Sequence, residues 1–203
     1  MIVADYFEEA LMARLPYGNL DALPPEVRAQ VELFGDLNID RMLAHACTVI
    51  GPLHETTRSI LAESTLDPRL RELVILLVAH RRHCAYEAVQ HEVSARAVGV
   101  TQAQLDALGA NELTDRVFTD ADRAVLALVD AALIGQGDVP DDVFDGAHHH
   151  LDDRGTVELM ILVALYSGVA ILLNSLRVDI DATARMRFAP NGNGDSEGLS
   201  GNS

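Results

Sequence analysis

The chemically active residue types of this chain concentrate between Glu72 and His91, in the run ELVILLVAHRRHCAYEAVQH. If Cys84 begins a helix, Glu87 and His91 follow three and seven residues later, which places all three within a sector of about 60° on one face. A thiol at a helix N-terminus has a lowered pKa, because the helix dipole favours the thiolate. A carboxylate beside an imidazole can relay protons. The spacing therefore indicates thiol or proton-transfer chemistry, with Glu72, Cys84, Glu87 and His91 as candidate catalytic residues.

Glu72 lies on the apolar helix that precedes Cys84. A tight helical hairpin would return its carboxylate beside Cys84, where it could also orient His91 or tune the pKa of that imidazole. Each residue has an ordinary structural interpretation as well. In that interpretation Cys84 is a small buried hydrophobe and His91 is a partly buried histidine. Both glutamates would lie on solvated helix faces, where Glu72 could form a surface ion pair with the nearby Arg69 or Arg71. The conjunction of all four favours a functional site.

A metal site is a rival interpretation of the same helix. His83, Glu87 and His91 are spaced i, i+4 and i+8, so that two ligands would align well and the third would be strained by drift along the helix. The run 148–150 of three histidines lies in a polar, Asp-rich segment and is interpreted as a solvated helix end. Neither G-x-G-x-x-G, a P-loop, G-x-S-x-G nor C-x-x-C occurs. We therefore expect no metal and no cofactor.

The composition describes a globular chain with room for one substantial core, because 49% of its 203 residues are apolar. A net charge of −16 without a basic stripe excludes nucleic acid and anionic membranes as partners. The two cysteines form no disulfide framework, so we expect a reducing cytoplasm. The N-terminus lacks the apolar region of a signal peptide. The apolar run 159–173 contains Ser167 and Gly168 and is interpreted as a buried core or subunit-interface helix, too short to span a bilayer.

Helix signals dominate and no alternating strand pattern occurs, so we predict an all-α, single-domain bundle of about eight helices. Asp67-Pro68 and the capping boxes at Thr101 and Thr119 mark helix starts, and Gly99 and Gly135 mark ends. Gly51-Pro52 should break or kink the helix that contains it. The expected helices span residues 5–14, 25–34, 39–64, 68–81, 84–99, 101–108, 119–134, 140–151 and 156–176. The Gly-, Asn- and Ser-rich composition of residues 189–203 predicts a disordered tail.

Several motifs resemble the carboxymuconolactone decarboxylase-like superfamily, which includes alkyl hydroperoxidase D. They are R-E-L-V-I-L-x-V-A, C-x-Y-E-x-x-x-H and A-x-x-x-G-V-T, followed by a second half from TDADRAVLALVDAAL through GTVELMILVALYSGVAILLNSL. The resemblance covers roughly residues 35–180. It implies an orthogonal helical bundle of the alkyl hydroperoxidase D type in residues 35–188, preceded by a helical extension in 1–34. It also implies a homo-oligomer, such as a trimer or hexamer, with its site near a subunit interface.

The spacing of Glu72, Cys84, Glu87 and His91 matches the Glu, Cys, Cys, His order of the hydroperoxidase. Glu87 stands where the hydroperoxidase has its peroxide-attacking cysteine, so the disulfide cycle within that motif is impossible. We therefore expect a cofactor-independent acid–base enzyme that acts on a small carboxylate or lactone-type substrate by decarboxylation, isomerisation or related proton transfer. Glu87 and His91 would serve as base and acid. The alternatives are a single-thiol peroxidase that uses Cys84 with an external thiol, and a non-catalytic oligomeric helical protein.

Three further side chains are candidates for substrate binding: Tyr86, Tyr166 and Asn174. Tyr86 lies about 200° around the helix from Cys84, so packing with its hydroxyl at the rim is its structural alternative. Tyr166 and Asn174 are polar residues on an otherwise apolar helix, where an internal hydrogen bond is the alternative. The expected partners are a small-molecule substrate and further copies of the chain.

Overall fold

The structure is a computed structural model that describes residues 12–182. Within this range the chain forms nine α-helices and two 3₁₀ turns and no β-strand, which confirms the all-α prediction. The helices are α1 (Pro25–Phe34), α2 (Asn38–Leu43), α3 (Ile50–Ala62), α4 (Pro68–Arg81), α5 (Ala85–Ala97), α6 (Gln102–Gly109), α7 (Asp120–Ile134), α8 (Asp141–His148) and α9 (Asp153–Leu176).

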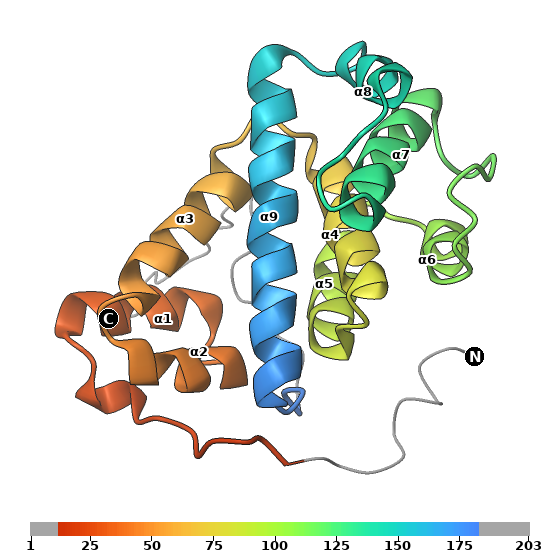
Figure 1. Cartoon of the computed structure of the whole chain (residues 1–203). Coiled ribbons are helices and arrows are strands. Elements are labelled where there is room, and N and C mark those ends of the chain that lie inside the picture. The colour runs from red at the N-terminus through yellow and green to blue at the C-terminus, as the bar shows by residue number, and fades with distance from the viewer. Residues whose placement is uncertain (1–11, 183–203) are drawn as a thin grey trace, which may run out of the picture.

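Helix α9 forms the axis of the molecule, and the other helices pack on either side of it (Figure 1). In this view α1, α2 and α3 lie on one side of α9, and α4 to α8 lie on the other. Helix α4 contacts α5, α7 and α9, while α1 packs against α3, which in turn contacts α9. The two groups of helices therefore meet at α9, where the candidate site is found.

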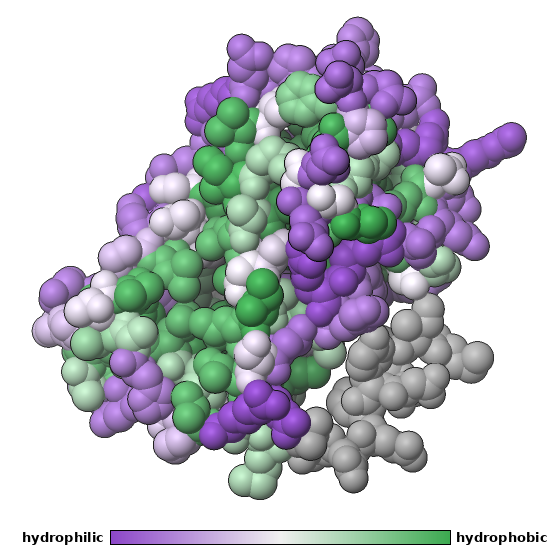
Figure 2. All heavy atoms as spheres, viewed as in Figure 1, coloured by the Kyte–Doolittle hydropathy of each residue, from purple (hydrophilic) through white to green (hydrophobic). Residues whose placement is uncertain are grey.

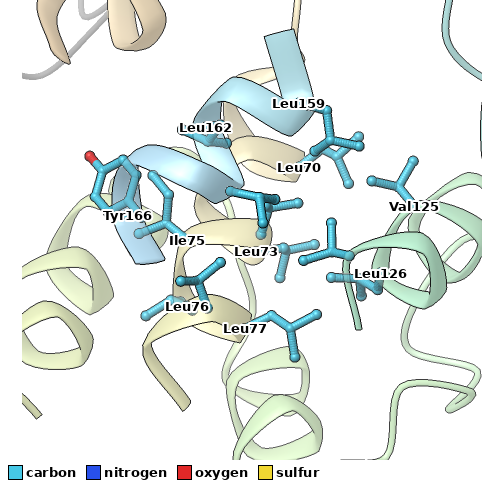
Figure 3. Packing of buried hydrophobic residues seen from close by; sticks show 14 of the residues in the cluster. Leu70, Leu73, Ile75, Leu76, Leu77, Val125, Leu126, Leu159, Leu162 and Tyr166 are labelled. Atoms are coloured by element: carbon cyan, nitrogen blue, oxygen red, sulfur yellow. The ribbon is translucent and has the colours of Figure 1, made fainter. Parts of the chain in front are cut away.

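Helix α4 is the buried centre of the larger group. The Asp67 carboxylate caps it by accepting the Leu70 N–H, and Pro68 occupies the first turn. Residues 70–79 are all buried, so this helix has no solvent-facing side, as expected for a helix surrounded by others. Figure 3 shows its leucines packed among those of α7 and α9, with Tyr166 at the edge of the cluster and its hydroxyl directed away from them.

The connection from α4 to α5 is a tight helical hairpin, as the sequence predicts. His83 has a left-handed backbone with φ of 50°, and Cys84 is the N-cap of α5. The Cys84 N–H donates to the Ala79 carbonyl at 2.8 Å, which closes the turn. Helix α5 ends just before Gly99, whose φ of 93° agrees with the predicted glycine stop.

The helix expected at 39–64 is interrupted, but not at Gly51-Pro52. Helix α2 ends at Leu43, a 3₁₀ turn follows at Ala44–Ala46, and α3 begins at Ile50. Gly51 and Pro52 therefore lie in the first turn of α3, where the missing proline N–H costs no helical hydrogen bond. The capping boxes at Thr101 and Thr119 are both formed.

Helix α9 starts earlier than predicted, and two other predicted segments lie mostly or wholly outside the described residues. Helix α9 begins at Asp153 rather than at residue 156, because the Asp152 side chain caps it by accepting the Gly155 N–H. The helix expected at 5–14 lies mostly outside the described residues, and residues 12–14 are not helical. The tail at 189–203 lies wholly outside the described residues.

Helix α9 is long and apolar enough to cross a membrane by length and composition, a test that the core helix of a soluble protein also passes. Within the fold, 39% of its most apolar window is buried. Val157, Ile161 and Ile171 on this helix are exposed. Figure 2 shows apolar side chains gathered on the face that α9 and α3 present. Use of this surface in a homo-oligomer stays a prediction.

Candidate functional site

The hairpin of α4 and α5 joins two of the predicted catalytic residues in a buried hydrogen bond. His91 Nδ1 lies 2.8 Å from Glu72 Oε2, and both side chains are less than 6% exposed. The Glu72 carboxylate therefore accepts Nδ1–H and leaves Nε2 as the free nitrogen of His91. This contact agrees with the hypothesis that Glu72 orients His91. It contradicts the structural alternative in which Glu72 lies on a solvated face.

The register of the hairpin explains why Glu72 meets His91 and not Cys84. In an antiparallel helix pair, residues equally distant from the turn lie opposite each other. The Ala79–Cys84 and Glu72–His91 contacts are both centred on the bond between Arg81 and Arg82. The expected placement of the Glu72 carboxylate beside Cys84 is therefore wrong.

A buried arginine, Arg71, lies close to the hydrogen-bonded pair of Glu72 and His91. Arg71 is 1% exposed, and its Nε lies 4.0 Å from Glu72 Oε1. Burial lowers the pKa of Arg71, while the neighbouring Glu72 carboxylate raises it. A buried guanidinium thus lies beside the carboxylate that faces His91.

Glu87 is buried near His91 but forms no comparable pair. Its side chain is 3% exposed, and among the described residues its carboxyl oxygens have only a weak contact with the Cys84 thiol and no partner of full hydrogen-bond geometry. Burial raises the pKa of Glu87 to about 8, and the nearby Cys84 thiol opposes this only in part. Glu87 is therefore a neutral carboxylic acid at neutral pH, able to donate a proton or a hydrogen bond.

Cys84 does not have the lowered pKa that its place at the start of α5 predicts. Burial, followed by the Glu87 carboxylate, raises the pKa of the Cys84 thiol to about 12, and the backbone N–H groups of Glu87 and Tyr86 lower it by less. Its side chain packs in an apolar cluster with Met42 and Leu173. Cys47 is also free but exposed. Desolvation thus outweighs the helix dipole at this thiol.

The buried side chains face a cavity of about 90 Å³ between the two groups of helices. Glu87, Gln90 and His91 of α5 and Tyr166 of α9 contribute its polar wall on one side, and α1 to α3 cover the other. Most of the remaining lining is apolar. A small apolar cavity with a few convergent polar groups is the usual form of a small-molecule site.

The two predicted substrate-binding tyrosines both line this cavity, but in different states. The Tyr86 hydroxyl donates to Asp181 Oδ2 at 2.6 Å and accepts the Ile39 N–H at 3.3 Å, so its polar atom is already engaged. The Tyr166 ring lies edge-on to the His91 ring, with centroids 4.9 Å apart. Burial and the charges of Glu72 and Glu87 raise the pKa of Tyr166 well above its ordinary value. Tyr166 is therefore a protonated donor beside His91.

The structure does not support the expected substrate-binding role of Asn174 or the rival metal-site interpretation of His83, Glu87 and His91. Asn174 is exposed and donates to the Arg82 carbonyl at 2.8 Å, so it ties α9 to the α4–α5 turn and does not line the cavity. His83 lies in the exposed turn before α5, so it cannot align with Glu87 and His91 as metal ligands. Among residues 12–182 there is no group of three His, Cys, Asp or Glu residues placed to hold a metal.

Two cavity residues, Asp40 and His54, were missed by sequence reasoning. Asp40 Oδ1 of α2 lies 3.0 Å from His54 Nε2 of α3, and both side chains are buried and line the cavity. No motif links them, and only the packing of α2 on α3 brings them together. The signal available in the sequence was a single Asp and a single His in two amphipathic segments.

A second cavity of about 420 Å³ lies between α4, α5 and α6. Cys84, His80 and Glu92 are among its lining residues, whereas Glu87 and His91 line the first cavity. The predicted face shared by Cys84, Glu87 and His91 is thus divided between two cavities. The smaller cavity is lined by His91, which is hydrogen-bonded to Glu72, and by Asp40 and His54, and we take it as the candidate active site.

Part of the chain matches a family of known proteins. Residues 53–131 match the family model of the carboxymuconolactone decarboxylase family. Glu72, Cys84, Glu87 and His91 fall inside the matched range, whereas Asp40 and Tyr166 fall outside it. Among curated proteins the chain has no match.

Solved structures show the same fold at low sequence identity. An uncharacterized peroxidase-related protein from Ralstonia eutropha JMP134, described as an alkylhydroperoxidase AhpD core, is 18% identical with a TM-score of 0.75, over 86% of this chain and 95% of that one. A peroxidase-related protein from Silicibacter sp. TM1040 is 15% identical with a TM-score of 0.74, over 86% and 95%. The debrominase Bmp8, solved with 2,3,4-tribromopyrrole, is 17% identical with a TM-score of 0.68, over 88% and 96%. These likenesses establish the alkylhydroperoxidase D-like fold.

Proposed function

We propose that this chain is a cofactor-independent enzyme that transfers protons on a small carboxylate or lactone-type substrate. Its residues 53–131 match the carboxymuconolactone decarboxylase family, and its fold is of the alkylhydroperoxidase D type. The observation that carries this proposal is the buried Glu72–His91 hydrogen bond beside the neutral Glu87 acid, at the wall of one cavity. A non-catalytic scaffold predicts these side chains in solvent or in surface ion pairs, with no cavity beside them.

Each group has a defined part in the proposed reaction. His91 Nε2 accepts a proton from a substrate carbon, while Glu72 fixes the tautomer and stabilises the imidazolium that forms. The Tyr166 hydroxyl and the Glu87 acid are protonated at neutral pH and can donate hydrogen bonds to the negative oxygen that develops on the substrate. Proton transfer of this kind supports isomerisation, and the same donors support the loss of carbon dioxide.

The test uses one lactone and one carboxylate as probes, with EDTA present. We expect the chain to convert α-angelica lactone into β-angelica lactone in D₂O, with deuterium entering the product, or to decarboxylate acetoacetate. Proton NMR measures both reactions. The His91→Gln variant provides the matched background, because it removes the proposed base alone. Rates equal to that background for both probes would contradict the proposed function.

The single-thiol peroxidase makes an opposite prediction for Cys84. Because the thiol is buried and its pKa is raised to about 12, we expect Cys84 to react with iodoacetamide at about pH 8 at least tenfold more slowly than the exposed Cys47. Mass spectrometry of the native protein resolves the two sites, and Cys47→Ser should remove nearly all rapid labelling. Rapid labelling of Cys84, with peroxide consumption that disappears in Cys84→Ser, would favour the peroxidase instead.

A further inference from the structure

The wall of the cavity opposite His91 contains a second buried carboxylate–imidazole pair. Asp40 is 1% and His54 7% exposed, and both residues line the same cavity as Glu87, His91 and Tyr166. Asp40 lies on α2, in a segment that the family match does not cover. A role for Asp40 and His54 therefore does not follow from the matched residues, and must be argued from their geometry.

The Asp40 carboxylate lies close to the His54 ring, although the two contacting atoms do not have hydrogen-bond geometry. Asp40 Oδ2 accepts the Leu37 N–H at 2.8 Å, which holds the carboxylate at the start of α2. Asp40 Oδ1 lies 3.0 Å from His54 Nε2, and the His54 ring packs on Phe34 with centroids 4.6 Å apart. His54 Nε2 thus faces a buried carboxylate, and Nδ1 is its other ring nitrogen. The Glu72–His91 pair also joins a buried carboxylate to an imidazole, through Nδ1 and with a hydrogen bond.

Burial of such a pair needs a reason, because desolvating an ion pair commonly costs more than the pairing returns. Polar atoms around the same cavity also lack partners. Gln90 Oε1, Asp40 Oδ1 and His54 Nε2 are buried without a partner of hydrogen-bond geometry among the described residues. The buried Glu87 oxygens have only a weak contact with the Cys84 thiol. Buried polar groups without partners are rare in proteins and indicate that a ligand or water satisfies them. These atoms point to a ligand in the cavity.

The charges of the lining limit what that ligand can be. None of the lining residues in the described part of the chain is lysine or arginine, the side chains that normally bind a carboxylate. The carboxylates of Asp40 and Glu72 already face imidazoles. The cavity of about 90 Å³ favours a small ligand. Of the two substrate classes proposed above, an uncharged lactone fits this lining better than a carboxylate, because the described lining offers no lysine or arginine to bind the carboxylate.

We infer that His54, beside Asp40, is a second proton-transfer residue of the site, and that the two imidazoles act together on a small uncharged lactone or related carbonyl compound. This inference rests on the proposed function. In the step, His91 Nε2 takes a proton from one substrate carbon, the electron pair moves through the conjugated system, and His54 in its imidazolium form donates its Nδ1 proton at the far carbon. No electrons leave the substrate. Exchange with water then returns both imidazoles to their starting forms.

The first test is binding, which needs neither turnover nor a variant. We expect 2(5H)-furanone to shift the ring signals of both His54 and His91 in NMR spectra of the ¹⁵N-labelled wild-type chain. Crotonate, an anion of similar size, should bind at least tenfold more weakly. The inference is overturned if the lactone shifts neither signal, or if it shifts the His91 signal to its full extent without shifting the His54 signal. Equal binding of crotonate would also overturn it.

The second test is the isomerisation of α-angelica lactone. We expect His54→Gln to lower kcat by about 10- to 100-fold, with a smaller loss in Asp40→Asn, because Asp40 acts by positioning. His45→Gln is the matched control, since His45 lies in the same part of the chain and contacts the Pro16 carbonyl outside the cavity. A wild-type rate in His54→Gln with loss in His91→Gln would refute the inference and keep the proposed function. Binding through both rings without turnover would overturn the proposed function and, with it, the proton-transfer role of His54.

Discussion

Replacing His91 by glutamine is expected to lower the rate of lactone isomerisation by about 10²- to 10⁴-fold, the usual contribution of a positioned general base. His91 is the imidazole whose Nδ1 is held 2.8 Å from the buried Glu72 carboxylate, so its free nitrogen has a fixed direction beside Tyr166. The glutamine amide can still donate a hydrogen bond to Glu72 but cannot accept a proton from carbon. Steady-state kinetics of the wild type and the variant measure the loss.

Two further variants show whether the loss comes from chemistry. Glu72→Gln keeps the shape of the pair but removes the charge that stabilises the imidazolium, so we expect a smaller loss of about tenfold or more in kcat. His45→Gln, outside the cavity, should retain the wild-type rate. Thermal unfolding and circular dichroism of each variant report whether the fold persists. A folded His91→Gln protein with a rate within twofold of wild type would remove His91 from the mechanism.

The sequence predicted those parts of the fold and site that depend on local chemistry. The caps at Asp67, Thr101 and Thr119 are formed as expected, because a side-chain oxygen within three residues satisfies each helix N-terminus. The Glu72–His91 contact follows from two helices joined by a tight turn. The α4–α5 hairpin pairs residues that are equally distant from its turn, however, and the prediction that placed Glu72 beside Cys84 did not take this register into account.

The features that depend on tertiary burial could not be predicted in this way. The position of Cys84 at a helix start predicts a low thiol pKa, but the surrounding apolar cluster and Glu87 raise it instead. The Asp40–His54 pair forms only when α2 and α3 fold onto the cavity. Asn174 resembled an internal polar residue on an apolar helix, yet it lies on the exposed side of α9. In each of these three cases the positions of the residues along the chain are compatible with both a buried and an exposed side chain, and only the tertiary structure decides between them.

These differences change the chemistry that the chain is expected to perform. A cysteine whose pKa is raised to about 12 is a poor nucleophile near neutral pH, whereas a buried glutamic acid whose pKa is about 8 is a good proton donor there. Under the proposed function, Glu87 supplies an acid at the position where the resemblance implies a cysteine. The raised pKa of Cys84 has burial as its larger cause and Glu87 as its second.

Burial of Glu87 should also make the stability of the protein fall as pH rises. The pKa of Glu87 is about 8 in the folded chain against 4.5 for the ordinary side chain, so between these values the folded state holds a proton that the unfolded state has lost. The free energy of unfolding contributed by this group is therefore largest below about pH 4.5 and decreases up to about pH 8. The decrease is at most about 1.4 kcal/mol per pH unit, the value for a single proton.

Glu87→Gln replaces the carboxylic acid with a neutral amide of the same size and should abolish this contribution. The quantity to measure is the difference in unfolding free energy between wild type and variant, from urea titrations at several pH values between about 5 and 9. Subtracting the variant's unfolding free energy from that of the wild type removes the pH dependence of all the other acidic residues, which both proteins share. We expect the wild type to lose stability relative to the variant by a few kcal/mol over this range, and the difference to become constant above about pH 8.

Glu92→Gln provides the control, because Glu92 lies on the same helix but is paired with Arg96 at the surface. Its difference from the wild type should be nearly independent of pH. A flat difference for Glu87→Gln would mean that the carboxyl is ionised in the folded protein, and it would remove the neutral acid on which the proposed hydrogen bond to the substrate depends.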